Sequence, residues 1–327
     1  SQLTRICALP PCLAALSQGE NIESAAASTI DLGSGVAQVE IRLPRRLFFE
    51  TLSQRSGLQV TDDGDLMQLL TSLAAVRKEY DRMAPAMQAA LDTGLKVLGF
   101  SDHSPYPFDD GYCSGFRMRC DQTAEYIRTI AALRDEYRGD IDIHIGFEAE
   151  YYPRYFGRLL EMLEPTEYEY LILGQHFLGN ELDSQPNFEE TDDPARLRQY
   201  TDQCMEALNT GAFSCFAHPD VMHFVGDETL YRAESRRLCR EAKACGVPLE
   251  INLLGMGLHR YYPREAFWEE AAAVGNAVIL GWDAHRRDWM RQTEQEAAGE
   301  TLIARLGLHR LDYLTLIRPH PAAHTGE

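Results

Sequence analysis

Six short apolar runs in this chain each end in side chains that could bind a metal ion or move a proton. Each run has the length of a strand and is rich in Val, Ile, Leu and Phe, and helical pattern fills most of the gaps between the runs. Strands that alternate with helices in this way form parallel βαβ units. In a parallel barrel the carboxyl ends of all strands face one side, so we expect these side chains to meet in one pocket. They are Asp102, His103, Glu148, His176, His218, Asn252, Asp283 and His285.

The chemistry of this set is that of a hydrolytic metal site, because it combines imidazoles with carboxylates and contains no thiolate. Asp283 and His285 lie two residues apart, so on an extended backbone both side chains face the same way. Glu148 ends an apolar run, where a buried carboxylate is costly unless it is paired or bound to metal. A single histidine such as His103 or His218 could equally be structural. The same chemical type at five strand ends favours metal ligation by most of the set.

The elements that must position these side chains occupy residues 86–318, where strands and helices alternate. Predicted strands cover 96–103, 141–148, 170–176, 213–218, 247–252 and 277–285, and predicted helices cover 85–94, 122–137, 154–163, 194–210, 230–245 and 264–274. This alternation predicts an α/β fold, with a closed barrel favoured over an open sheet. Residues 1–85 follow the pattern poorly: a strand is expected at 37–44 and helices at 47–54 and 65–83. The tail at 319–327 is expected to fray.

The composition is typical of a soluble globular protein with one large domain, or one domain with an appendage. The chain has 327 residues, of which 45% are hydrophobic and 25% charged. A membrane partner is not expected, because no apolar run reaches the roughly 18 residues that span a bilayer. The formal net charge of −19 argues against a nucleic-acid partner. The eight cysteines include no CxxC pair, and a chain of this length needs no disulfide framework, so we expect reduced thiols in a cytoplasmic protein.

The apolar runs and their polar ends resemble the successive motifs of the PHP superfamily of metal-dependent phosphoesterases, and most closely its histidinol-phosphatase branch. The motifs are GFSDHSPYP, GFEAEYYP, GQHF, AHPD, EIN and WDAH, and FRM at residues 116–118 adds to the likeness, which covers roughly residues 86–315. The resemblance implies a distorted (β/α)7 TIM-like barrel with up to three divalent ions, usually zinc, manganese or iron. It also implies a small phosphorylated substrate. The implied reaction is the hydrolysis of L-histidinol phosphate to L-histidinol and phosphate, a step of histidine biosynthesis.

The resemblance also implies roles for individual residues. The implied metal ligands are His103, Glu148, His176, His218, Asp283 and His285. Glu148 with His176 and His218 would form one complete site, and Glu148 would bridge to a second ion. Asp283 or His285 would protonate the leaving alkoxide. Independently of the resemblance, loops that would face the pocket and the end of the 247–252 strand offer candidate substrate-binding residues: Arg117, Arg119, Arg260 and Asn252. Arg117 is favoured as a bidentate clamp on phosphate, with a catalytic role, because it lies in the FRM motif.

The sequence departs from the family pattern at its start. Such proteins normally begin with a strand bearing His-x-His, whereas no histidine precedes His103 here. The expected strand at 37–44 is a candidate replacement for the first barrel strand, and residues 1–85 could supply substitute ligands such as Asp62, Asp63 or Asp65. The N-terminus could instead be a disrupted version of the gene, or the barrel could have lost turnover. These alternatives stay open, as do a PHP phosphoesterase with a different phosphate substrate and the oligomeric state.

Overall fold

The computed structural model describes residues 26–31, 37–42, 87–109, 111–285, 287–290 and 293–321. The chain divides into two compact units, Ser1–Ala75 and Val76–Glu327. In the first unit, β1 (Ala26–Asp31) and β2 (Ala37–Arg42) form a two-stranded antiparallel sheet, and β2 occupies the strand expected at 37–44. The helices predicted at 47–54 and 65–83, the acidic residues at 62, 63 and 65, and the last six residues of the tail lie outside the described residues.

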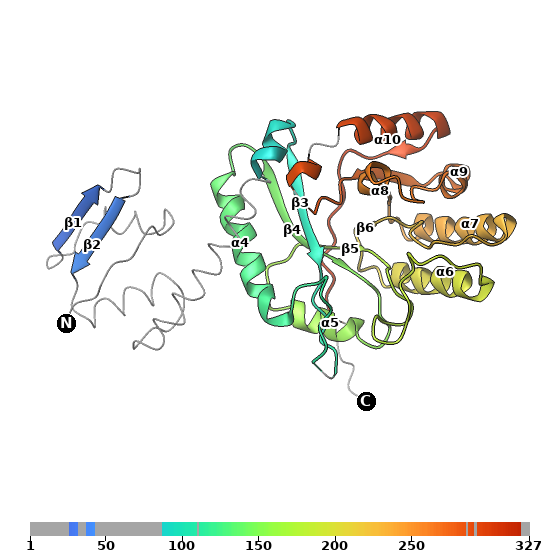
Figure 1. Cartoon of the computed structure of the whole chain (residues 1–327), viewed down its shortest axis with the longest axis horizontal. Coiled ribbons are helices and arrows are strands. Elements are labelled where there is room, and N and C mark those ends of the chain that lie inside the picture. The colour runs from blue at the N-terminus through green and yellow to red at the C-terminus, as the bar shows by residue number, and fades with distance from the viewer. Residues whose placement is uncertain are drawn as a thin grey trace. The chain divides into compact units, whose positions relative to one another are not determined.

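The second unit is built on one sheet of seven parallel strands that follow chain order (Figure 1). The strands are β3 (Val97–His103), β4 (Asp142–Ala149), β5 (Tyr170–Leu173), β6 (Cys215–Phe216), β7 (Leu249–Asn252), β8 (Ala277–Gly281) and β9 (His309–Arg310). The predicted α/β fold of seven strands is confirmed. Among the described strands, however, β3 and β9 are the two ends of the sheet, so these strands form a half-barrel rather than the closed barrel that we favoured.

Helices follow the strands and cover the sheet. They are α4 (Thr123–Glu136), α5 (Phe156–Leu163), α6 (Pro194–Asn209), α7 (Glu228–Ala244), α8 (Leu253–Gly257), α9 (Glu265–Val274) and α10 (Thr293–Leu306). In Figure 1, α6, α7, α9 and α10 lie side by side in chain order. Short 3-10 helices occupy Cys120–Gln122 and Arg287–Met290. None of the described helices is long and apolar enough to cross a membrane.

Local sequence signals set the limits of these helices. Asp193 caps α6 by accepting a hydrogen bond from the Ala195 amide at 2.9 Å, and Pro194 occupies the first helical position, where no amide is needed. Asp227 caps α7 through the Leu230 amide at 2.7 Å. The helices α6 and α7 begin and end within about three residues of the predicted limits.

The core lies between the sheet and its helices. Ile145, Phe147, Leu171, Leu249 and Ile251 are fully buried on the strands. Strands of a parallel sheet are covered on both faces, which is why they read as nearly continuous apolar runs. Burying each such side chain stabilises the fold by roughly 1.5–3 kcal/mol. The strands therefore form a rigid base for the polar residues at their carboxyl ends.

Candidate metal centre

A buried carboxylate, Glu148, lies at the centre of the candidate site, at the carboxyl end of β4. Its Oε1 lies 3.0 Å from Nε2 of His218 and 3.6 Å from Nε2 of His176. Its Oε2 lies 3.9 Å from Nδ1 of His103. The three imidazoles follow or end three other strands, as the sequence predicted. Four side chains from four parallel strands therefore converge on one point.

Strand register and two backbone features bring these side chains together. His103 pairs directly with Glu148 in the register of β3 and β4. Gly174, between β5 and His176, leaves space for the carboxylate, because a Cβ there would collide with Glu148 Oε1. His218 has a φ of 32°, a left-handed conformation that is rare for a residue with a side chain. Its amide donates a 2.9 Å hydrogen bond to Oε2 of the buried Glu250, which holds that turn in place.

Burial and neighbouring charges shift the pKa values of the ionisable groups in the site. Burial alone would raise the pKa of Glu148, but the charges of His103, His218 and His176 beside it hold that pKa well below its usual range. Burial disfavours a charged His218, yet the hydrogen bond and charge of Glu148 raise the pKa of His218 to about 9. The carboxylate is thus kept ionised and acceptor-only, which is the state that binds a cation.

The donors at this point fit a divalent metal ion. Glu148, His176 and His218 each offer a ligand atom, and these atoms lie within 4.8 Å of one another. Nδ1 of His103 is buried and has no hydrogen-bond partner among the described residues. An unsatisfied buried nitrogen is costly, so its position beside a carboxylate favours a bound cation. Mixed imidazole and carboxylate ligands suit zinc, manganese or iron.

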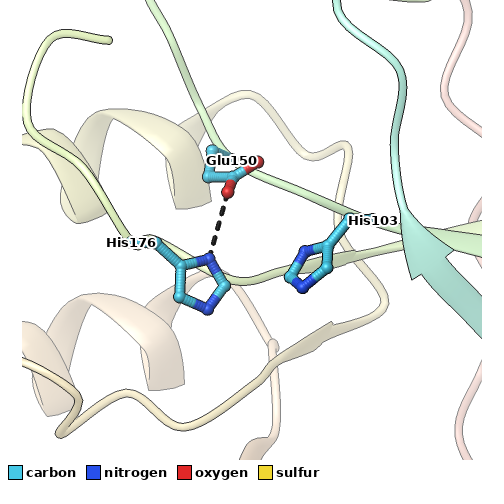
Figure 2. Close-up of side chains that lie close together, drawn as sticks. All are labelled: His103, Glu150 and His176. Carbon is cyan, nitrogen blue, oxygen red and sulfur yellow. Dashed lines mark hydrogen bonds and ion pairs between the residues drawn. The ribbon is translucent and has the colours of Figure 1, made fainter. Parts of the chain in front are cut away.

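A second group of possible ligands contains a residue that the sequence analysis missed. His103, Glu150 and His176 also offer atoms within 4.8 Å of one another, and Figure 2 shows Glu150 pointing at His176. Glu150 is fully buried. Burial opposes its ionisation, but the charge of Arg117 and the hydrogen bond from His176 lower the pKa of Glu150 to about 2. The signal was present in the sequence, because Glu150 follows Glu148 by two residues, the spacing used to pair Asp283 with His285.

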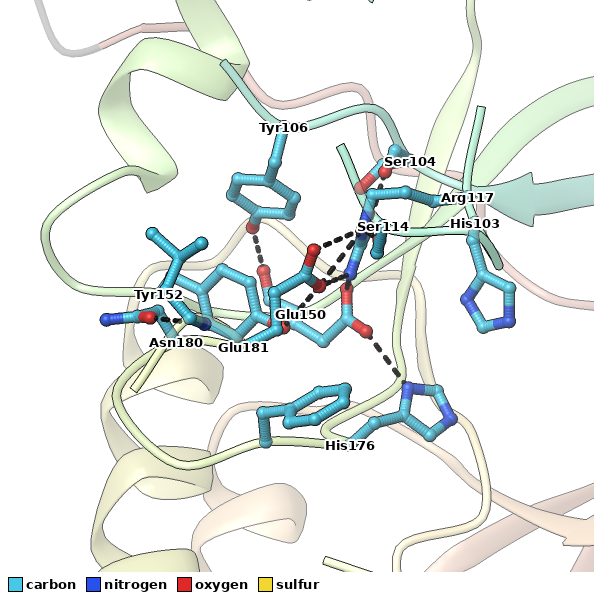
Figure 3. A network of polar contacts seen from close by, with 12 residues as sticks. His103, Ser104, Tyr106, Ser114, Arg117, Glu150, Tyr152, His176, Asn180 and Glu181 are labelled. Atoms are coloured by element: carbon cyan, nitrogen blue, oxygen red, sulfur yellow. Dashed lines mark hydrogen bonds and ion pairs between the residues drawn. The ribbon is translucent and has the colours of Figure 1, made fainter. Parts of the chain in front are cut away.

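Arg117 differs from its expected role. Its guanidinium is buried and binds Glu150, Glu181, the Ser104 carbonyl at 2.7 Å and the Ser114 hydroxyl at 3.1 Å (Figure 3). These contacts occupy all three nitrogens of the guanidinium, and Arg117 does not line the cavity over the site. The geometry therefore does not favour the expected clamp on phosphate. Glu181 was not predicted, because it lies in a loop with no sequence signal.

The other two arginines also lie away from the ligands. Arg119 is exposed and forms an ion pair with Asp121 at 2.8 Å. Arg260 is exposed and donates to the Tyr262 hydroxyl at 2.9 Å. Neither lines the cavity over the site, so their predicted contact with substrate has no support from these positions.

Asn252, Asp283 and His285 form a linked group at the ends of β7 and β8. The Asn252 amide donates to Asp283 Oδ2 at 3.0 Å and to Glu250 Oε2 at 3.2 Å, while its oxygen accepts from the Gly255 amide at 2.7 Å. Asn252 is thus occupied in orienting Asp283 and capping α8. His285 is half exposed, and its Nδ1 lies 3.3 Å from Asp283 Oδ1. Its ring centroid lies 6.2 Å from that of His103, but neither Asp283 nor His285 belongs to the ligand groups found among the described residues.

One cavity of about 1360 Å³ connects these side chains. Its lining includes His103, Glu148, His218, Glu250, Asp283 and His285. Phe116 also lines it: the ring is 44% exposed, lies edge-on to His103 with centroids 5.2 Å apart, and stacks on Phe177 at 6.0 Å. A substrate in this cavity would therefore meet carboxylates and imidazoles at one end and an aromatic wall beside them.

Comparison with known proteins agrees with this geometry. A family model described as "PHP domain" matches residues 76–253, just over half of the chain. The chain belongs to the PHP family. A relative named "Probable histidinol-phosphatase", from Deinococcus radiodurans, is 30% identical over 205 residues, which are 61% of this chain and 78% of that protein. The crystal structure of histidinol phosphate phosphatase from Lactococcus lactis, complexed with zinc, L-histidinol and phosphate, has a TM-score of 0.55 and 20% identity over 70% of this chain and 88% of that one.

The N-terminal part resembles a different protein. A model of the middle domain of stage IV sporulation protein A matches residues 1–101. The stage IV sporulation protein A of Clostridioides difficile is 30% identical over 83 residues, which are 25% of this chain and 16% of that protein. The chain thus spans about a sixth of this relative, and the match to the family model covers the region that follows the barrel pattern poorly and extends into β3.

Proposed function

We propose that this PHP protein is a metal-dependent phosphomonoester hydrolase that converts L-histidinol phosphate and water to L-histidinol and phosphate. The observation that carries the proposal is the buried Glu148 carboxylate with imidazoles of His218 and His176 at 3.0 and 3.6 Å. The names of the Deinococcus relative and of the Lactococcus enzyme support the choice of substrate. We also propose that the enzyme is cytoplasmic and acts in histidine biosynthesis.

The ligand chemistry follows from the donors. Glu148, His176 and His218 would hold the first divalent ion, with His103 beside it. When bound, the cation would make water a better nucleophile and offset the charge of the phosphate ester. The zinc in the Lactococcus complex supports zinc here, with manganese and iron as the alternatives. Further ions would draw on Asp283 and His285, so that up to three remain part of the proposal.

The remaining groups would manage protons and orientation. Water attacks phosphorus in line and releases one proton to solvent, the bond from phosphorus to the ester oxygen breaks, and the departing alkoxide takes up a proton. With only the first ion bound, His285 is the side chain we assign to deliver that proton, because it is half exposed at the cavity and its imidazole contacts Asp283 at 3.3 Å. Asn252 would keep Asp283 in place for this contact through its 3.0 Å hydrogen bond.

One observation favours a second candidate, a barrel that binds metal and phosphate without turnover. No histidine lies among residues 1–102, so these residues offer no His-x-His ligand pair. Under this alternative the Glu148 group would still bind an ion, but the ligands of further ions would be incomplete.

Phosphate release from a panel of esters, measured on protein with counted zinc or manganese, tests the proposal. We expect metal-dependent release with the highest kcat/KM for L-histidinol phosphate. A preference for a sugar or nucleotide phosphate would support phosphoesterase activity but contradict the proposed substrate. If folded, metal-loaded protein releases phosphate from no ester, the proposed hydrolase is wrong and the non-catalytic barrel is favoured.

A further inference from the structure

A buried cluster of opposite charges lies next to His176. The side chains of Arg117, Glu150 and Glu181 are each at most 1% exposed. Arg117 Nη2 lies 3.1 Å from Glu150 Oε2, and its Nε lies 3.1 Å from Glu181 Oε2. Tyr152 donates a 3.3 Å hydrogen bond to Glu181 (Figure 3). One guanidinium faces two carboxylates, so one negative charge remains for other donors.

That charge is directed at His176. The two oxygens of Glu150 have different partners: Oε2 accepts from Arg117, and Oε1 lies 3.0 Å from His176 Nδ1 (Figures 2 and 3). An ionised carboxylate can only accept, so Nδ1 is the nitrogen that carries the proton. The lone pair is then left on Nε2, and Nε2 is the nitrogen that faces Glu148 at 3.6 Å.

We propose that Glu150 is the positioning residue of this site: clamped by Arg117, it fixes the tautomer and orientation of His176 and thereby strengthens metal binding at Nε2. The inference deepens the proposed function, on whose metal site it rests. It gives a role in metal binding to three buried charged residues that do not line the cavity.

Direct ligation by Glu150 is the competing possibility, because Glu150 also lies within 4.8 Å of His103 and His176 ligand atoms. Electrostatics oppose it. A cation on Glu150 would lie next to the Arg117 guanidinium, which already occupies Oε2, and two positive charges so close in a buried site repel strongly. Among the described residues, Glu148 has no guanidinium partner, since its carboxylate contacts imidazoles.

The test compares Glu150→Gln with the matched control Glu181→Gln. Both variants remove one negative charge from the same arginine, but only Glu150 contacts His176. Zinc affinity is measured by competition with a chromophoric chelator, and zinc per chain by elemental analysis at saturation. We expect Glu150→Gln to weaken zinc binding by roughly 10–100-fold with an unchanged count, and Glu181→Gln to bind zinc like the unaltered chain.

Two outcomes would overturn the proposal. Loss of one zinc per chain in Glu150→Gln at saturation would make Glu150 a direct ligand. An equal weakening in both variants would mean that the cluster acts only through general stability, which melting of the metal-free variants would show in parallel.

A second measurement needs no change to the cluster. Long-range proton–nitrogen spectra of the zinc-loaded chain with labelled histidine, with His176 assigned from a His176→Asn variant, report which nitrogen carries the proton. The proposal requires the proton on Nδ1, and a proton on Nε2 would contradict it. Both tests use zinc without substrate, so a failure of phosphatase activity would not be confused with a failure of this inference.

Discussion

Glu148 is the residue on which the candidate site most depends, because three imidazoles share its two oxygens. We expect Glu148→Gln to lose zinc and to lower phosphate release by more than the roughly 10–100-fold that removing a partner of a ligand costs. Zinc per chain and kcat with L-histidinol phosphate measure the effect. Glu169→Gln is the control, because Glu169 contacts His144 and Arg134 at 2.6 Å, away from the ligand groups. Full zinc occupancy in Glu148→Gln would show that Glu148 is not a metal ligand.

Phe116 is the residue from which we expect substrate preference. Its exposed ring lines the cavity beside His103, so an imidazole-bearing substrate can pack on it. Aromatic pairs contribute about 0.5–1.5 kcal/mol beyond area burial, so Phe116→Ala should reduce the preference for L-histidinol phosphate over glycerol phosphate by about 2- to 10-fold. Steady-state kinetics with both esters measure this ratio. Phe188→Ala, at a similarly exposed ring that does not line the cavity, should leave it unchanged.

At this scale, sequence reasoning identified the residues with a strand-end signal and missed those without one. The positions of His103, Glu148, His176 and His218 follow from parallel strands that end on one side. The partners of Arg117 could not be predicted, because they depend on how loops far apart in sequence fold onto each other. Glu181 is 64 residues from Arg117, and no pattern links the two.

Among the elements, the connection from β5 to His176 requires a residue without a side chain at Gly174. A Cβ at this position would collide with Glu148 Oε1. Gly174→Ala should therefore displace the carboxylate and lower activity on the order of 100-fold, as a 1 Å misplacement can. Zinc affinity and kcat measure the loss. Gly157→Ala, in α5 with open space around it, is the control and should leave both unchanged. Normal zinc affinity in Gly174→Ala would show that the carboxylate can move without consequence.

The turn after β6 is tied to the start of α9 by Asp220, and this link should make stability depend on pH. Asp220 accepts from the Arg264 amide at 2.6 Å and from the Trp268 indole at 3.1 Å. Burial nevertheless dominates and raises the pKa of Asp220 to about 6. The native state then binds the proton more tightly than the unfolded chain, where an aspartate has a pKa of about 3.9. The stability that this proton provides is present below about pH 4 and is lost as pH rises towards 6.

Asp220→Asn tests this link, because asparagine cannot titrate. The stability of the metal-free unaltered chain should fall between about pH 4 and pH 6 by up to about 3 kcal/mol more than that of the variant. Chemical unfolding across this range measures the difference. Parallel pH profiles for the two proteins would contradict the assignment of this loss to Asp220.

The arrangement of elements was largely predictable, and the exceptions have physical reasons. Strands such as β4 and β7 are buried on both faces and appear in the sequence as apolar runs. Helices such as α6 begin at a capping residue followed by proline, which the sequence shows directly. The seventh strand, β9, has two residues, His309 and Arg310, both exposed. It carries no apolar run, so it was missed, and with it α10, which precedes it.

For the whole molecule, the division into units leads to the last prediction. All ligand groups found among the described residues lie between His103 and His218, inside the Val76–Glu327 unit. The region before this unit matches a family model of a different protein, and that match continues into the unit as far as residue 101. We therefore expect a chain beginning at Val76 to bind as many zinc ions as the full chain.

Both forms should also gain stability from zinc by mass action, about 2.7 kcal/mol at 100 times the dissociation constant, and lose it to a chelator. Elemental analysis and melting with and without zinc measure the count and the gain. A higher count in the full chain would contradict the expectation and would mean that residues before Val76 contribute ligands, as the acidic residues Asp62, Asp63 and Asp65 could. An equal count with phosphatase activity in both forms would mean that the ligands within Val76–Glu327 suffice for catalysis.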